Sequence, residues 1–207
     1  MRSSVSFGLR AVALVALITL ATPAMAQVDF EPLGVTCGPA FFPTFCVVDM
    51  SGDGNTILYR DRIWTASGGM QMIGGPPTGF VVTALSDDGS TVVGNVFLTD
   101  EPLGSRFEAA IWLGGDEWQA LGGLPNTSPC GTSYTSSYDV SVTEAGTKVV
   151  GLAWIGMRCA GGAHAFEWTE ETGMVDLGSI VADRSSRANV ISADASVIAG
   201  WSDTSFG

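Results

Sequence analysis

One short pattern occurs four times in this sequence, and the repetition constrains the fold more than any other feature. Each copy is a run of branched apolar residues, a small polar turn and a second apolar run, at residues 47–59, 81–94, 138–151 and 189–200. Ser, Thr and Asp side chains bond nearby backbone amides and Gly accepts positive φ, so each copy predicts a β-hairpin. Units repeated in this way predict an array whose members bury their apolar faces against one another.

The first three hairpins are each followed by a second pair of predicted strands. A tryptophan stands at one equivalent position of the third strand, as Trp64, Trp112 and Trp168, and a Gly-containing turn leads into a fourth strand. We expect these tryptophans to be largely buried between neighbouring sheets. We expect Gly89 and Gly146 to supply the hairpin turns. An all-β chain of four-stranded units of about 50 residues fits a β-propeller, and an open β-solenoid is the alternative.

The spacing of the copies predicts repeats at about 47–80, 81–128 and 138–181, followed by a partial repeat at 189–207. The partial repeat lacks the tryptophan strand and the strand after it. Propellers have at least four blades. We therefore expect an array that is incomplete at its C-terminal end, in a chain that is a fragment or one part of a longer array.

Residues 1–26 have the pattern of a secretory signal peptide: Arg2 and Arg10, the apolar run 11–20, and a small-x-small cleavage site at 24–26. The run is too short for a membrane anchor, which needs about 20 apolar residues. The sequence therefore predicts a secreted, extracellular or cell-surface protein with no membrane span in its mature part; the periplasm is the alternative. Residues 27–46 contain Pro32, Pro39 and Pro43 and are expected to cover an open edge of the array.

The charge balance limits the partners that the protein can have. The chain has 9 basic and 21 acidic residues, and removal of Arg2 and Arg10 with the signal peptide leaves seven basic residues, for a balance of −14. Nucleic acids and anionic membranes are bound mainly through Lys and Arg. Such an acidic surface argues against both, and an unknown extracellular ligand or surface partner is expected instead.

All four cysteines lie in the predicted exported part, where disulfides are favoured. Four cysteines allow three pairings. We predict two local bridges, Cys37–Cys46 and Cys130–Cys159. Cys37 and Cys46 lie nine residues apart in one Pro- and Phe-rich segment, and Cys130 and Cys159 both fall in the third repeat, each inside extra sequence that the second repeat lacks; free or shuffled thiols are the alternative. The sequence has no CxxC or His-rich spacing, so a zinc site is not expected.

The third repeat resembles the HAF-repeat family of extracellular repeat proteins, which is named for a His-Ala-Phe triplet. The triplet is His164-Ala165-Phe166, followed by Glu167-Trp168 and by the segment 173–178, and the preceding strand 146–151 has the family's Gly-Thr-x-Val-Val-Gly form. The likeness covers about 47–200 and is looser in the second repeat, where Ala109-Ala110-Ile111 replaces the triplet. It implies a secreted or surface-associated β-repeat protein and brings no catalytic residues with it.

His164 is the only histidine. A Ser-His-Asp site needs a base held by a carboxylate and facing a nucleophile. The other repeats are read as placing Ala or Arg at this position. We therefore expect an edge or interface histidine rather than a catalytic one.

Two acidic patterns are candidates for a functional site, one for calcium binding and one for glycoside hydrolysis. Asp49-x-Ser51-x-Asp53-Gly54 matches the first half of a calcium loop, but position twelve is Arg60 where a bidentate Glu is needed, so a structural turn is preferred. The adjacent acids Asp87-Asp88 and Glu170-Glu171 are expected on outward-pointing turns, whereas glycosidases need paired carboxylates across a pocket.

No catalytic, cofactor-binding or metal residues are assigned. The leading hypothesis is an exported, non-enzymatic β-repeat protein with a binding or surface-structural role. The alternative is a secreted, glycosidase-like propeller hydrolase whose site lies in blades that this sequence does not contain.

Overall fold

The structure, a computed structural model, describes residues 47–76, 78–100, 104–124, 134–155, 162–182 and 184–204. All of them belong to one compact unit, Pro39–Gly207. The signal peptide, the segment 27–46 and both predicted disulfides, Cys37–Cys46 and Cys130–Cys159, lie outside the described residues. The described part contains only strands and connections, and therefore no helix that could cross a membrane.

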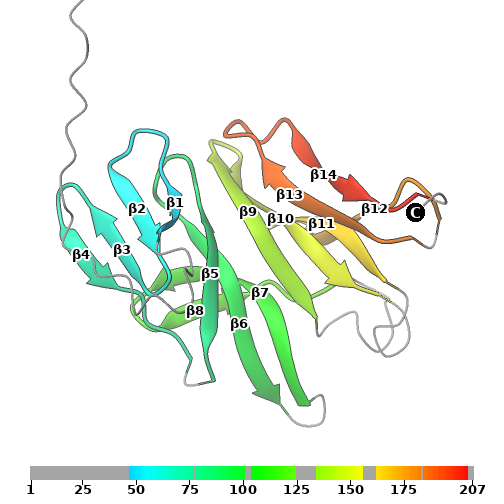
Figure 1. Cartoon of the computed structure of the whole chain (residues 1–207), viewed down its shortest axis with the longest axis horizontal. Helices are drawn as coiled ribbons and strands as arrows, with labels where there is room; N and C mark the ends of the chain where they lie inside the picture. Colours follow the sequence, from blue (N-terminus) through cyan, green and yellow to red (C-terminus); the bar gives the residue numbers. More distant parts are fainter. Residues whose placement is uncertain are drawn as a thin grey trace, which may run out of the picture. The chain divides into compact units, whose positions relative to one another are not determined.

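The strands form four antiparallel sheets, and the strands of each sheet follow one another in chain order (Figure 1). The bounds in sheet 1 are β1 (Val47–Met50), β2 (Thr56–Tyr59), β3 (Arg62–Thr65) and β4 (Gly69–Met72). Sheet 2 contains β5 (Phe80–Leu85), β6 (Val92–Asp100), β7 (Gly104–Gly114) and β8 (Glu117–Ala120). Sheet 3 contains β9 (Thr135–Thr143), β10 (Gly146–Trp154), β11 (Ala163–Thr169) and β12 (Gly173–Gly178). Sheet 4 is the pair β13 (Ser186–Ile191) and β14 (Ile198–Ser202).

The all-β prediction and the four-stranded antiparallel units are therefore confirmed. Consecutive sheets also contact one another in a regular way. The first strand of each sheet contacts the first strand of the next, and β9 and β13 also pack against the second and third strands of the sheet before them.

Each pair of consecutive sheets encloses its own apolar core. Sheets 1 and 2 bury Leu58 with Val82 and Val92, and sheets 3 and 4 bury Val150 with Ile191. The core between sheets 2 and 3 contains the largest fully buried side chain, Phe166. The apolar face of each repeat is thus covered by a neighbouring repeat, as the repetition predicted.

The three tryptophans share a place in the ladder but differ in burial. Trp64, Trp112 and Trp168 lie in β3, β7 and β11, the third strand of each four-stranded sheet. Trp168 is buried in the core between sheets 2 and 3. Trp64 and Trp112 are only partly buried, and Trp112 packs against the core between sheets 1 and 2. The Nε1–H of Trp112 donates to Gly115 O at 3.0 Å near the surface, which satisfies the indole without full burial.

A β-bulge recurs in the first strand of every sheet, where the register shifts at Val48, Thr83, Tyr138 and Asn189. A bulge brings the backbone of the bulged strand close to its partner. The partner residue beside the bulge is a glycine in three sheets. A Cβ on Gly94, Gly151 or Gly200 would overlap the carbonyl oxygen of Val81, Ser136 or Arg187, respectively. The glycine of the Val-Val-Gly pattern is therefore required by close backbone approach.

A hydroxyl three residues before the bulge joins each of the last two sheets to the sheet before it. Thr135 Oγ1 accepts a hydrogen bond from Ala109 N at 2.9 Å and donates to Gly122 O at 3.0 Å. Ser186 Oγ accepts from Ala165 N at 2.9 Å and donates to Gly178 O. Each hydroxyl therefore bridges the third strand and the end of the fourth strand of the preceding sheet.

At the interface between sheets 1 and 2 the corresponding carbonyl is that of Gly74, and a different group donates to it. Phe80 occupies the position of the hydroxyl residue in β5, and its ring lies 5.3 Å from that of Trp118, centroid to centroid. Trp118 Nε1–H donates to Gly74 O at 2.8 Å, and Gly74 corresponds to Gly122 and Gly178 because all three lie ten residues after the tryptophan of their repeat. These carbonyls are partly buried, a position in which a missing donor costs stability, and each interface supplies one.

An aspartate of the first strand forms a further inter-sheet bond at two of the three interfaces. Asp49 Oδ2 accepts from Leu85 N at 2.9 Å, and Asp139 Oδ2 accepts from Ile191 N at 2.7 Å. Burial raises the pKa of Asp139, although the amides of Ile191 and Val140 stabilise its charged form. Asp49 therefore serves the array rather than a calcium loop.

We predict that Gly151→Ala destabilises the protein more than Gly54→Ala. The new Cβ at Gly151 would overlap Ser136 O and the Phe166 ring, whereas Gly54 has φ 71° and open space around it. Overpacking at Gly151 should cost about 1–3 kcal/mol, and positive φ alone about 1 kcal/mol or somewhat more. Urea unfolding of both variants measures the difference, and equal losses would show that the close approach at the bulge is not required.

Candidate functional site

Each sheet has a turn between its first and second strands. Three of these four turns have the same hydrogen-bond network, built on a Ser-x-Asp sequence. The serine Oγ donates to the aspartate Oδ1 at 2.7, 2.6 and 2.6 Å, and it accepts the amide N–H five residues later at 3.0, 2.9 and 3.0 Å. The pairs are Ser51–Asp53, Ser86–Asp88 and Ser192–Asp194. Gly54, Gly89 and Ala195 follow the aspartates with φ of 71°, 72° and 57°.

These hydrogen bonds favour the charged form of each aspartate. The Ser192 hydroxyl, with the hydroxyl and amide of Ser196, lowers the pKa of Asp194 to about 2. The amide of Asn55 and the Ser51 hydroxyl lower the pKa of Asp53. Partial burial opposes the shift at Asp88, yet the hydrogen bonds from Ser86 and Ser90 still lower its pKa. The three aspartates are thus structural groups of the turns.

The corresponding turn of sheet 3, between β9 and β10 (turn 3), lacks this network. Ser141 corresponds to the turn serines, but Thr143 stands where the others have aspartate. β9 and β10 stay paired up to Thr143 and Gly146, which leaves Glu144 and Ala145 as a two-residue turn. Gly146, the first residue of β10, has φ 110°. Ser141 Oγ donates instead to Ala193 O in the turn of sheet 4, at 2.7 Å. Turn 3 is therefore tighter than its neighbours.

An open groove of about 1150 Å³ surrounds this tight turn. Sheet 2 contributes Trp112, Leu113 and Gln119 to its lining, sheet 3 contributes the β9–β10 and β11–β12 turns, and sheet 4 contributes Asp194 and Ala195. The groove thus lies where the repeat pattern changes. A concave surface with an aromatic side chain and convergent polar groups is the usual form of a binding site.

The groove carries a net negative charge. Its lining contains the acids Glu167, Glu170, Glu171 and Asp194 but only one basic residue, Lys148. Lys148 Nζ lies 3.0 Å from Glu167 Oε2, so its charge is already compensated. Glu170 and Glu171 are exposed on the β11–β12 turn. The groove therefore presents uncompensated carboxylates to a ligand.

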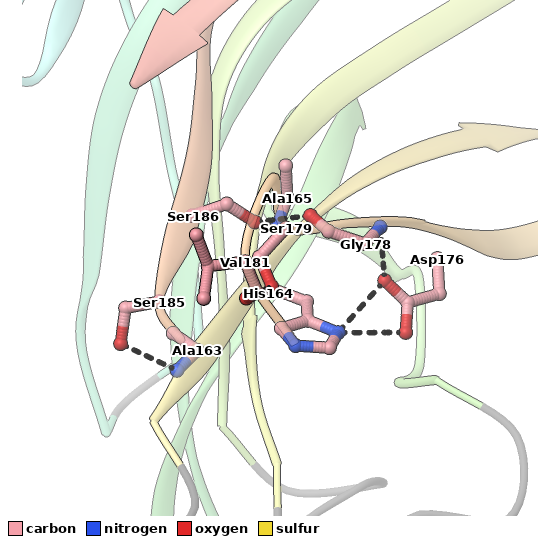
Figure 2. Close-up of polar contacts among 9 residues, drawn as sticks. All are labelled: Ala163, His164, Ala165, Asp176, Gly178, Ser179, Val181, Ser185 and Ser186. Atoms are coloured by element: carbon pink, nitrogen blue, oxygen red, sulfur yellow. Dashed lines mark hydrogen bonds and ion pairs between the residues drawn. The ribbon is translucent and has the colours of Figure 1, made fainter. Parts of the chain in front are cut away.

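His164 makes a close pair with Asp176 (Figure 2). Its Nδ1 lies 3.0 and 2.8 Å from the two carboxylate oxygens of Asp176, and Gly178 N donates to Asp176 Oδ1 at 2.7 Å. The His164 side chain is 16% exposed. Its Nε2 is buried and has no hydrogen-bond partner among the described residues. No described serine or threonine therefore forms a hydrogen bond with that nitrogen, as a nucleophile of a hydrolytic triad would.

The ladder corrects the sequence alignment at this position. Gly94 pairs with Ala110 and Gly151 pairs with Phe166, so the residue that corresponds to His164 is Glu108 rather than Ala109. Glu108 is also ionisable and lies 3.5 Å from Arg106 in a buried ion pair. The expectation that other repeats place Ala at this position is wrong, because the alignment was shifted by one residue.

The two pairs of adjacent acids in the sequence lie in different parts of the structure. Glu170 and Glu171 line the groove, whereas Asp87 and Asp88 lie on the turn of sheet 2 and are not among the lining residues. No group of three or more His, Cys, Asp or Glu side chains in the described ranges could hold a metal ion. The aspartates of the calcium-like segment, Asp49 and Asp53, accept protein hydrogen bonds instead.

The groove was not predicted from the sequence. The sequence does contain a sign of it: turn 3 has Thr143 at the position where the other three turns have an aspartate. Comparisons with known proteins add no assignment: no protein-family model matches the chain, and no curated protein matches it.

We predict that stability falls as the pH drops from about 4 towards 2, and that Asp194→Asn reduces this dependence. The folded pKa of Asp194 is about 2 against 3.8 for a free aspartate, so the unfolded chain binds the proton more readily and acid favours unfolding. Urea midpoints measured between pH 2 and pH 6 test this. Asp203→Asn, an exposed residue outside the turns, is the control; equal pH slopes in both variants would contradict the role of the turn network.

Proposed function

We propose that this chain is an exported, non-enzymatic β-repeat protein of the HAF-repeat type that binds an extracellular partner in the groove around turn 3. The observation that carries the proposal is the coincidence of the groove with the one turn that lacks the Ser-x-Asp network. A turn that only closed a hairpin would have no reason to differ from its three counterparts.

The repeats in this proposal act as blades of a propeller-like array. Three features support that arrangement: four-stranded meanders, contacts between successive first strands, and the same carbonyl satisfied across each interface. Such an array is a rigid frame. It holds the side chains of three sheets at fixed positions around the groove.

The charge of the groove indicates a cationic ligand, such as a lysine-rich peptide segment. Glu170, Glu171 and Asp194 carry negative charge without a basic partner among the lining residues, and the acidic balance of the whole chain acts in the same direction. The indole of Trp112 adds an aromatic surface at which a cation is favoured. Charges at such an exposed site act through the solvent, so binding should weaken as salt rises.

We predict that Glu170→Gln/Glu171→Gln weakens binding of an octalysine peptide by about five- to thirtyfold at low salt, since each exposed charge contributes on the order of 0.5–1 kcal/mol. The matched control is Asp116→Asn/Glu117→Gln, an adjacent exposed acidic pair of sheet 2 that is not among the lining residues. Calorimetric titration at two salt concentrations measures both. Equal loss in the two double variants would show non-specific attraction and contradict a groove site.

The second candidate is a glycosidase-like hydrolase. The observation that favours it is the presence of Glu167, Glu170 and Glu171 in one groove with Trp112, since two carboxylates across a pocket cleave glycosides. Hydrolysis of a panel of reporter glycosides, lost in Glu170→Gln or Glu171→Gln but not in the Asp116/Glu117 control, would replace the binding proposal with this one.

A further inference from the structure

β14 is an edge strand with an unusually exposed surface. Among the described residues it pairs only with β13, whereas β2, β6 and β10, the second strands of the other sheets, each have a neighbour on both sides. An edge strand presents unpaired N–H and C=O groups that favour pairing with another strand. The question is which strand this edge fits.

The register places β14 in the same role as β10. Gly200 corresponds to Gly151, because both face a bulge in the first strand and both lie against a carbonyl that excludes a Cβ. Trp201 then corresponds to Leu152, and it is 45% exposed where Leu152 is 9% exposed. In the first strand, Val190 is 54% exposed, but its counterpart in sheet 2, Ala84, is 3% exposed. Ala84 belongs to the core between sheets 2 and 3, so Val190 is open on the face that the following sheet covers in sheet 2. Apolar positions that are covered in other sheets are open in sheet 4.

The complete sheets also define the strand that pairs with the free edge of β14. The tryptophan of the third strand pairs with Ile57 in sheet 1 and with Val149 in sheet 3, and the counterpart of Val149 in β14 is Ile198. Gly151 pairs with Phe166, whose ring occupies the space that a Cβ on Gly151 would need. At Gly200 the nearest atoms to such a Cβ are backbone atoms of Arg187 and Ala188, and no aromatic ring takes the place that Phe166 has beside Gly151. The β14 edge therefore fits an antiparallel strand with Trp opposite Ile198 and Ala or Phe opposite Gly200.

We propose that β14 is a strand-acceptor site for a tryptophan-bearing β-hairpin of this repeat type, supplied by a repeat unit other than those described. A second copy of this chain is a poor donor. Its own strands of this pattern, β3, β7 and β11, are each paired on both sides within their sheets. Release of any of them would break two hydrogen-bonded ladders to form one.

The donor hairpin also has to match the charges near the edge. Arg187 lies between two aromatic rings, with its Cζ 4.5 Å from the centroid of Tyr138 and 5.6 Å from that of Trp201. These contacts link Trp201 of sheet 4 to Tyr138 of sheet 3 through Arg187 and orient the exposed indole. The β11–β12 hairpin of sheet 3 carries the acids Glu167 and Asp176, and a donor hairpin of the same charge suits a cationic residue such as Arg187 near the edge.

The test uses a synthetic hairpin of residues 162–178, added to the full chain in excess because isolated hairpins are only marginally ordered. Amide hydrogen exchange across Ile198–Ser202 should slow by about tenfold or more on addition of the peptide. A peptide with a photoreactive side chain in place of Trp168 should cross-link at Ile198. A scrambled peptide of the same composition should do neither.

Variants of the chain separate edge pairing from other binding. Ala199→Lys places a charge on the exposed edge and should abolish the protection, whereas Ala66→Lys, at an exposed position after β3, should leave it unchanged. Protection by the scrambled peptide, or equal protection in Ala199→Lys, would overturn the proposal. Amides of β14 that are already protected before the peptide is added, either in the monomer or with rising protein concentration, would overturn it too, since another segment or a second copy would then cover the edge.

Discussion

The bridging hydroxyl between consecutive sheets is the interaction on which the rest of the described structure depends. Thr135 and Ser186 each occupy one position in the first strand of a sheet and bond both a third-strand amide and a carbonyl after the fourth strand of the sheet before. Four-stranded meanders have little core of their own, so they need a neighbour to bury their apolar faces. The hydroxyl sets how that neighbour is aligned. The burial of Phe166 between sheets 2 and 3 depends on this alignment.

The candidate site follows from a local exception to this regularity. Three turns share a Ser-x-Asp network, and their aspartates are held in the charged form by hydrogen bonds. Turn 3 replaces the aspartate with Thr143 and is shorter, and the groove opens around it. A repeat array holds neighbouring side chains rigidly, and a change in one turn therefore alters the surface without disturbing the core. That separation allows a binding surface to differ while the frame stays the same.

The sequence predicted much of the fold because its signals are local. The alternating apolar runs and polar turns marked all four hairpins, and the structure has strands at each of them. It failed where the outcome depends on pairing between distant residues. The His164–Asp176 pair requires the register of β11 with β12. The counterpart of His164, Glu108, could have been found from the sequence, since each lies four residues before the tryptophan of its repeat. The half-burial of Trp64 and Trp112, and the choice of Thr135 among many hydroxyl residues, depend on how sheets pack against each other.

The most direct test of the account is the free energy of unfolding of Thr135→Val, compared with Thr99→Val at an exposed strand position. Valine keeps the shape and strand preference of threonine but removes the hydroxyl, which leaves Ala109 N–H and Gly122 C=O without the partners that they have in the structure. The account predicts a loss of about 1–3 kcal/mol for Thr135→Val and a change within about 0.5 kcal/mol for the control. Equal stability of the two variants would show that the sheets are aligned by something other than the bridging hydroxyl.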